Sequence, residues 1–230
     1  MSDDFATRVS GIGALAEPAR RALYEFVVAQ PEPVGREQAA AGVELPLHTA
    51  KFHLDRMVEE GLLEVEFRRL TGRTGPGAGR PAKLYRRAVR QISVSLPERR
   101  YDLAGEILAA AVDRAGREHL PVEEAVREAA EAAGRRVGAG VAEAQEVPDE
   151  AMRTTQVLTA HGYEPRTRDD EIVLGNCPFD ALAREHTRLV CGLNECFLDG
   201  VLTGLGCTRL TATLDPEPGL CCVKLRRRPR

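Results

Sequence analysis

The sequence lacks the segments that would place the protein in a membrane or carry it out of the cell. Its 230 residues contain no apolar run approaching the roughly 20 residues that a membrane-spanning helix requires. The N-terminal sequence MSDDFATRVS is acidic and polar, whereas a secretory signal begins with basic residues followed by apolar ones. We therefore expect a cytoplasmic protein that does not partner a membrane.

The sequence also lacks the short motifs by which many enzymes are recognised. It has no phosphate-binding loop, nucleophile elbow, HExxH zinc motif or dinucleotide-binding fingerprint. Its apolar content of 43% and charged content of 29% are ordinary for a soluble globular protein. The length allows two modest domains, each with its own core. We expect a protein that is not an enzyme.

Cysteine is missing from the first 176 residues, and all six cysteines follow within the C-terminal part. In a sequence that we expect to be cytoplasmic, a disulfide framework is disfavoured. The clustering instead favours a metal or redox site. The cysteines are Cys177, Cys191, Cys196, Cys207, Cys221 and Cys222.

The net charge of −3 conceals a basic segment. Between Arg68 and Arg100 ten basic residues accompany a single acid, Glu98. Such a block can neutralise DNA phosphates even within an acidic protein. The alternative is a basic loop that is merely solvated.

The stretch from Val34 to Arg86 has the order of elements found in a winged helix-turn-helix domain. Residues 1–16 are expected to be a frayed lead-in. A first helix should begin near Pro18 and end before the PEP sequence at 31–33, where prolines cannot continue it. The expected elements that follow are a short helix over Arg36–Ala41, a helix from Pro46 to about Glu60, and strands over Leu62–Leu70 and Ala82–Arg87.

The helix from Pro46 is the candidate DNA reader, because the second helix of a helix-turn-helix enters the major groove with its N-terminal half. Lys51 and Arg56 can donate to guanine edges or phosphate, and Thr49 can meet a thymine methyl. Arg73 and Arg80, on the Gly-rich loop between the strands, suit phosphate or minor-groove contact. The predicted DNA-binding residues are His48, Thr49, Lys51, Phe52, Arg56, Arg73, Arg80 and Lys83.

The residues HTAKFHLDRMVEEGLLEVE, followed by GRPAKLY, resemble the ArsR/DeoR-type winged-helix regulators of bacteria. The resemblance implies that the partner is a double-stranded DNA operator. Reading of symmetric half-sites favours a homodimer.

A helical segment follows the winged-helix region. Periodicity predicts helices over Tyr101–Ala115 and about Val122–Ala142. Small residues in the second helix permit close packing, either across a dimer interface or within the chain. We therefore expect an α+β protein with three parts: a winged helix-turn-helix domain over 1–90, a helical linker or dimerisation segment over 91–148, and a cysteine-rich α+β sensor domain over 149–230.

The last part combines helices with two hairpins. A helix from Glu150 to about His161 precedes a hairpin over 163–174. Cys177 then lies in a loop, Cys191 begins a helix from about Leu189 to Leu205, and Cys221 and Cys222 lie in the last strand. A loop, a helix start and a strand can converge on one point. Thiolates are the ligands of iron–sulfur clusters, and a helix N-terminus lowers the pKa of a cysteine.

Other interpretations of the cysteines stay open. They include buried structural cysteines and a zinc site. Cys196 lies too far around the helix from Cys191 to share its face, which favours a core position or a secondary thiol. Cys207 and His186 are candidates for a fourth ligand.

The sequence NCPFDALAREHTRLVCGLN, with the later LDPEPGLCCVKL, resembles the SufR-type regulators. That resemblance implies a dimeric repressor of iron–sulfur assembly genes. It also implies a [4Fe–4S] cluster held by Cys177, Cys191 and one of Cys221 and Cys222. The alternative is a winged-helix regulator without a cluster, responding to thiol oxidation, zinc or a small ligand.

Overall fold

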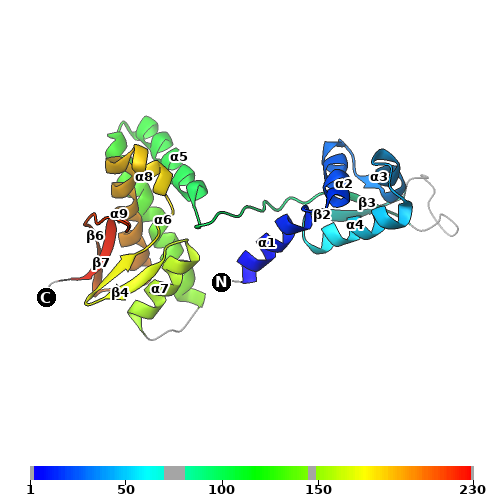
Figure 1. Ribbon diagram of the computed structural model, residues 1–230. Coiled ribbons are helices and arrows are strands. Elements are labelled where there is room, and N and C mark those ends of the chain that lie inside the picture. Colours follow the sequence, from blue (N-terminus) through cyan, green and yellow to red (C-terminus); the bar gives the residue numbers. More distant parts are fainter. Residues whose placement is uncertain (1–2, 70–80, 145–148, 229–230) are drawn as a thin grey trace. The chain divides into compact units, whose positions relative to one another are not determined.

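The computed structural model describes residues 3–69, 81–144 and 149–228, and the chain divides into two compact units (Figure 1). The first unit is Met1–Val94 and the second is Ser95–Arg230. Each has its own hydrophobic core. In the described part of the chain, no helix is both long enough and apolar enough to cross a membrane. The mixture of helices and two small sheets confirms the α+β class.

The N-terminal unit has the elements of a winged helix-turn-helix domain. Its three strands form an antiparallel sheet in the order β1-β3-β2. Residues of the helices and of the sheet together form the core, among them Leu23, Leu54 and Tyr85. The elements are α1 (Asp3–Ala14), α2 (Pro18–Ala29), β1 (Val34–Gly35), α3 (Arg36–Gly42), α4 (Leu47–Glu59), β2 (Leu63–Arg68) and β3 (Ala82–Arg87).

Local sequence signals set the boundaries of these elements. Helix α2 begins at Pro18, and the Glu17 carboxylate caps it by accepting a hydrogen bond from the Arg20 amide at 2.7 Å. The turn between α4 and β2 contains Gly61 with a φ of +71°, a conformation that glycine adopts without a steric penalty. The predicted helices and the hairpin are confirmed to within a residue or two.

Two features of this unit differ from expectation. Residues 1–16 were expected to fray, yet most of them form α1, and Ala14 is buried in the core. Packing holds this helix: Ser10 Oγ donates to Glu60 Oε2 at 2.7 Å. Strand β1 was not predicted because it is only two residues long, pairing Val34 with Tyr85.

The C-terminal unit packs helices against a four-stranded antiparallel sheet in the order β4-β5-β7-β6. Both hairpins predicted from the sequence are present, and β5 joins them by pairing with β7. The elements are α5 (Tyr101–Glu118), α6 (Val122–Ala144), α7 (Glu150–Ala160), β4 (Pro165–Arg168), β5 (Glu171–Leu174), α8 (Asp180–Glu185), α9 (Thr187–Gly204), β6 (Leu210–Leu214) and β7 (Val223–Arg227).

Helices α6 and α9 approach each other unusually closely, because glycines line their contact. A Cβ atom added to Gly134 would lie 2.0 Å from the Phe197 carbonyl oxygen. One added to Gly200 would lie 2.2 Å from the carbonyl oxygen of Glu131. Of the two roles predicted for the small residues of α6, packing within the chain is therefore the one found.

This packing changes the predicted division of the chain. The segment 91–148 was expected to stand apart as a linker or dimerisation segment. Its helices α5 and α6 instead share one hydrophobic core with α7, α9 and the second sheet. The first unit ends at Val94, close to the predicted boundary at residue 90, and everything after it is one unit.

Candidate functional site

Helix α4 buries one side and exposes the other, as expected for a recognition helix. Ala50, Leu54 and Met57 are buried in the core of the N-terminal unit. On the opposite side Phe52 is 66% exposed. This side borders a hollow of about 600 Å³ lined by Arg20, His48, Lys51, Phe52, Asp55, Arg56 and Glu59.

The cations of this face differ in whether an acid already holds them. Arg56 is paired with Glu59, at 3.3 Å, and with Glu60. Lys83, from β3, is paired with Asp55 at 2.5 Å. In the described part of the chain, Lys51 makes no ion pair.

Asp55 ties the recognition helix to the sheet. Its Oδ1 accepts hydrogen bonds from Lys83 and, at 2.8 Å, from the buried Tyr85 hydroxyl. Burial raises the pKa of Asp55, but these two hydrogen bonds outweigh it, and the pKa lies below its ordinary value. Burial, followed by the Asp55 carboxylate, raises the pKa of Tyr85. The link orients α4 on β3.

The hairpin that carries the wing is present, with Leu63 opposite Arg87 at one end and Arg68 opposite Ala82 at the other. Arg73 and Arg80, two of the predicted DNA contacts, lie outside the described residues. Their contact with phosphate or the minor groove stays a prediction. The roles of His48, Thr49, Lys51, Phe52, Arg56 and Lys83 in DNA binding also stay predictions.

The second candidate site lies in the C-terminal unit, where three segments carry cysteines. Cys177 lies in the loop between β5 and α8. Cys191 is one turn inside α9, which begins at Thr187 and not near Leu189 as expected. Cys221 and Cys222 precede β7, which begins at Val223, so they lie in the connection between β6 and β7 and not in the strand as predicted.

The fold brings these four thiols into mutual interaction. The side chains of Cys177 and Cys221 interact, which lowers the pKa of Cys177 and raises that of Cys221. For Cys191, burial and then the Cys222 thiol raise the pKa to about 12. The lowered pKa that a helix start predicted for Cys191 is therefore wrong, because Cys191 lies beyond the first turn and is 7% exposed.

The remaining ligand candidates lie in other surroundings. Cys207 is within 3.5 Å of the Thr154 hydroxyl. Burial raises the pKa of Cys207 and of Cys196. His186 is exposed where α8 meets α9. All six cysteines are free thiols. Over residues 3–69, 81–144 and 149–228, no three or more His, Cys, Asp or Glu side chains are arranged to hold a metal ion.

Two buried polar residues next to the thiols were not found from the sequence. Asn194 Nδ2 donates to the Cys221 sulfur at 3.3 Å, and Asn194 Oδ1 accepts from the Tyr163 hydroxyl at 2.5 Å. Asn194 is 1% exposed and Tyr163 is 2% exposed. The sequence did contain a sign of the role of Asn194. It directly follows Leu193 and lies three residues before Phe197, so a polar residue interrupts the apolar face of α9.

The loop of Cys177 is anchored to the first residues of its own unit. Arg99 Nη1 donates to the Cys177 carbonyl oxygen at 3.2 Å, and the Arg100 amide donates to the Pro178 carbonyl at 3.1 Å. Asn176 Nδ2 donates to the Glu98 carbonyl at 3.0 Å. Residues 98–100 therefore bind the polypeptide on both sides of Cys177.

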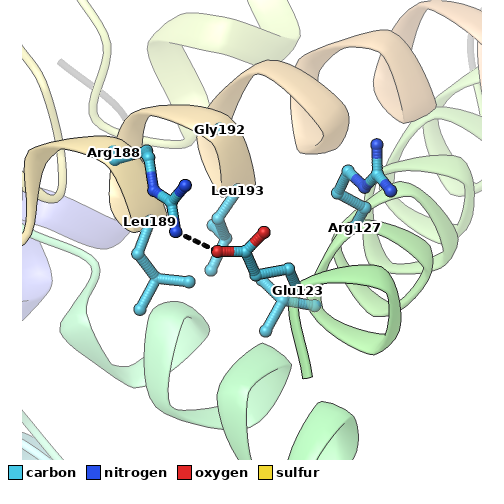
Figure 2. A pocket seen from close by; sticks show the side chains of 7 residues that line it. Glu123, Arg127, Arg188, Leu189, Gly192 and Leu193 are labelled. Atoms are coloured by element: carbon cyan, nitrogen blue, oxygen red, sulfur yellow. Dashed lines mark hydrogen bonds and ion pairs between the residues drawn. The ribbon is translucent and has the colours of Figure 1, made fainter. Parts of the chain in front are cut away.

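A third feature, a groove of about 200 Å³ between α6 and α9, contains no cysteine (Figure 2). Arg188 of α9 and Glu123 of α6 form an ion pair beside it, as Figure 2 shows. Leu189, Gly192 and Leu193 contribute the lining from α9. This ion pair adds a polar link between the two helices.

Comparison with known proteins identifies the N-terminal domain. Residues 15–66 match a family model described as "Helix-turn-helix domain", a winged, ArsR-like family. No curated protein and no solved structure matches the chain. The match confirms the helix-turn-helix domain that the sequence predicted, and it supports a DNA-binding transcriptional regulator. Proteins with this domain are typically regulators without catalytic activity.

Proposed function

We propose that the protein is a transcriptional repressor that binds operator DNA through its N-terminal unit and senses an iron–sulfur cluster through its C-terminal unit. The observation that carries the sensor is the gathering of Cys177, Cys191, Cys221 and Cys222 in a unit joined to a helix-turn-helix domain. The genes it controls would be those of iron–sulfur assembly or redox response.

On the DNA side, the proposal assigns base contact to the exposed face of α4. Lys51 makes no ion pair in the described part of the chain, so its ammonium can donate to guanine edges or phosphate. Phe52 can meet a thymine methyl with its exposed ring. Arg73 and Arg80 of the wing supply phosphate contact. A homodimer would place two such faces on a symmetric operator.

On the sensor side, the thiols fit an iron–sulfur cluster in number and type. Such clusters are held by cysteine thiolates. Cys177 and Cys191 would be ligands, together with one or both of Cys221 and Cys222. Phe179 and Val223, close to Cys177 and Cys222 in the sequence, are fully buried, so the thiols lie beside the core of this unit. When bound, the cluster would supply one-electron chemistry and sensitivity to oxidation.

The contacts of residues 98–100 offer a route from the thiols toward the DNA-binding unit. The N-terminal unit ends at Val94, only a few residues before Glu98, Arg99 and Arg100. These residues bind the loop on both sides of Cys177. A change in that loop therefore acts directly on the segment that joins the two units.

The first test is the iron, acid-labile sulfide and zinc content of full-length protein purified without oxygen, with its visible spectrum. We expect brown protein with matching iron and sulfide. Cys177→Ser and Cys191→Ser should each lose the iron, whereas Cys196→Ser should keep it. Colourless protein that takes up no cluster on reconstitution would refute the sensor. Full iron in Cys177→Ser would remove that residue from the ligands.

The second test asks whether the loop contacts carry the signal. Arg99→Gln should bind a cluster, yet its DNA affinity should respond less to cluster loss than that of the wild type. Arg184→Gln is the matched control. Both Arg99, at 3.7 Å, and Arg184, at 2.8 Å, pair with Asp180, but the Arg184 side chain is 76% exposed and does not touch the Cys177 carbonyl. An unchanged response in Arg99→Gln would exclude this route.

Thiol oxidation is a second candidate signal, favoured by the interaction of Cys177 with Cys221 and of Cys191 with Cys222. Each pair could lose two electrons and two protons to form a disulfide, with a peroxide reduced to water. In cluster-free protein, peroxide should then remove two or four free thiols and change DNA affinity. Unchanged affinity after such oxidation would exclude this signal.

A further inference from the structure

Asn194 is a polar side chain on the otherwise apolar, buried side of α9. A buried amide that lacks hydrogen-bond partners destabilises a core, so its partners identify what it is for. Asn194 has two: the Cys221 sulfur, 3.3 Å from Nδ2, and the Tyr163 hydroxyl, 2.5 Å from Oδ1. Both partners are themselves buried.

The chemistry of the three groups fixes the direction of these hydrogen bonds. A metal-bound thiolate has no proton, so its sulfur can only accept. Asn194 must then turn its NH₂ group toward Cys221, which leaves the carbonyl oxygen for Tyr163. A phenol hydroxyl can donate to that oxygen. The arrangement in the structure is therefore the one that a sulfur acceptor at Cys221 requires.

We propose that Asn194, held in orientation by Tyr163, is a positioning residue that donates an N–H···S hydrogen bond to Cys221 and tunes the group that Cys221 holds. The inference rests on the proposed function, and it favours Cys221 over Cys222 as the tuned ligand. The Cys222 sulfur interacts with the Cys191 thiol, and within the described residues no amide donates to it. Hydrogen bonds to ligand sulfurs help to set the reduction potential of a cluster.

The negative charge that reduction adds determines whether the hydrogen bond raises or lowers the reduction potential. Reduction adds negative charge to the cluster and its sulfurs, and a donor pointed at one of these sulfurs stabilises that charge. The hydrogen bond from Asn194 therefore raises the potential. Its loss should make the cluster harder to reduce.

The test compares variants that keep the core filled. Asn194→Leu alone would leave the buried Tyr163 hydroxyl without an acceptor, so it is combined with Tyr163→Phe, which makes the site apolar. In the double variant the midpoint potential, followed by visible absorbance in an anaerobic titration, should shift to more negative values. Tyr163→Phe alone should shift it in the same direction but less, because Asn194 loses its orientation and keeps its donor.

Thr154→Val is the matched control. Thr154 is as buried as Asn194, and its hydroxyl lies 3.5 Å from the Cys207 sulfur, outside the four thiols. Its removal should leave the potential unchanged. A double variant with an intact cluster and a wild-type potential would overturn the inference and leave the proposed function standing.

A measurement on cluster-free protein separates the two hypotheses. The destabilisation caused by Cys221→Ala is measured by urea unfolding in the wild type and in the double variant. A smaller cost in the double variant would show that Asn194 and Cys221 interact. If the wild type takes up no cluster, the proposed sensor fails, and the unfolding measurements alone decide on Asn194. Equal destabilisation by Cys221→Ala in the wild type and in the double variant would overturn the positioning of Cys221 by Asn194.

Discussion

Helices α4 and α9 carry the two candidate sites, and they use their surfaces in opposite ways. Helix α4 buries a single stripe, Ala50, Leu54 and Met57, and leaves Phe52 and its neighbours exposed. Helix α9 buries residues on most of its surface, among them Cys191, Asn194 and Gly200. One helix presents its polar side chains to solvent, whereas the other holds its thiols and Asn194 inside the core.

This difference predicts how each helix responds to mutation. Exposed side chains on α4 contribute little to folding, so their replacement should change DNA binding and leave stability almost unaltered. The side chains of α9 are packed on several sides, so replacing one of them should alter stability as well as function.

The largest effect is expected at the contact between α6 and α9. Gly200→Ala would place a methyl group 2.2 Å from the Glu131 carbonyl oxygen, so the helices must separate. Because backbone is less able to move than a side chain, we expect the C-terminal unit to lose about 3 kcal/mol or more. Urea unfolding followed by circular dichroism, with hydrogen exchange to distinguish the two units, measures the loss.

Gly192→Ala is the control on the same helix. A Cβ at Gly192 would have no atom within 4 Å, and alanine favours a helix over glycine by roughly 1 kcal/mol. This variant should be as stable as the wild type or more so. Equal stability of Gly200→Ala and Gly192→Ala would contradict the close approach of the helices.

The same contrast explains what could be predicted from the sequence. In the N-terminal unit the signals are local: Pro18 starts a helix, the PEP sequence ends it, and Gly61 makes the turn into β2. The spacing of Leu54 and Met57 then identifies the buried side of α4. Helix α1 escaped prediction because contacts distant in sequence, such as Ser10 with Glu60, hold it.

In the C-terminal unit the decisive contacts are long-range. Spacing alone suggested that a loop, a helix and the last strand bring four cysteines together. It could not place Cys191 beyond the first turn, nor identify burial as the main cause of its raised pKa. Asn194, which is bonded to Tyr163, meets Cys221 only because β7 returns beside β5, and no local pattern encodes that pairing.

An intermediate effect is expected in the reactivity of the thiols of cluster-free protein. The thiolate is the reactive form. The Cys221 thiol lowers the pKa of Cys177, whereas burial raises that of Cys191 to about 12. At pH 7.5, iodoacetamide should label Cys177 more than about tenfold faster than Cys191, as read by peptide mass spectrometry.

The labelling rates of the two cysteines should also depend differently on pH. The labelling rate of Cys191 should keep rising through the alkaline range, because its pKa of about 12 keeps its thiolate scarce there. That of Cys177 should level off once the pH exceeds its lowered pKa. Cys207, whose pKa burial also raises, serves as a second slow thiol. Equal rates for Cys177 and Cys191 at pH 7.5 would show that α9 does not shield its cysteine.

The smallest effect is expected on α4, where the replacement of Lys51 and that of Arg56 should change DNA binding differently. Lys51 is exposed and has no ion pair in the described part of the chain, while Arg56 is held by Glu59 and Glu60. Either alanine variant removes one positive charge, so both should weaken non-specific DNA binding about equally. Only Lys51→Ala should also lower the ratio of operator to non-specific affinity, by about fivefold to tenfold.

Fluorescence anisotropy at fixed salt measures both affinities, and the unfolding free energy of each variant should stay within about 0.5 kcal/mol of the wild type. If Arg56→Ala lowers the ratio as much as Lys51→Ala, the ion pairs open on DNA and Arg56 reads bases after all. If either variant unfolds more easily by several kcal/mol, α4 is not the independent exposed surface that distinguishes it from α9.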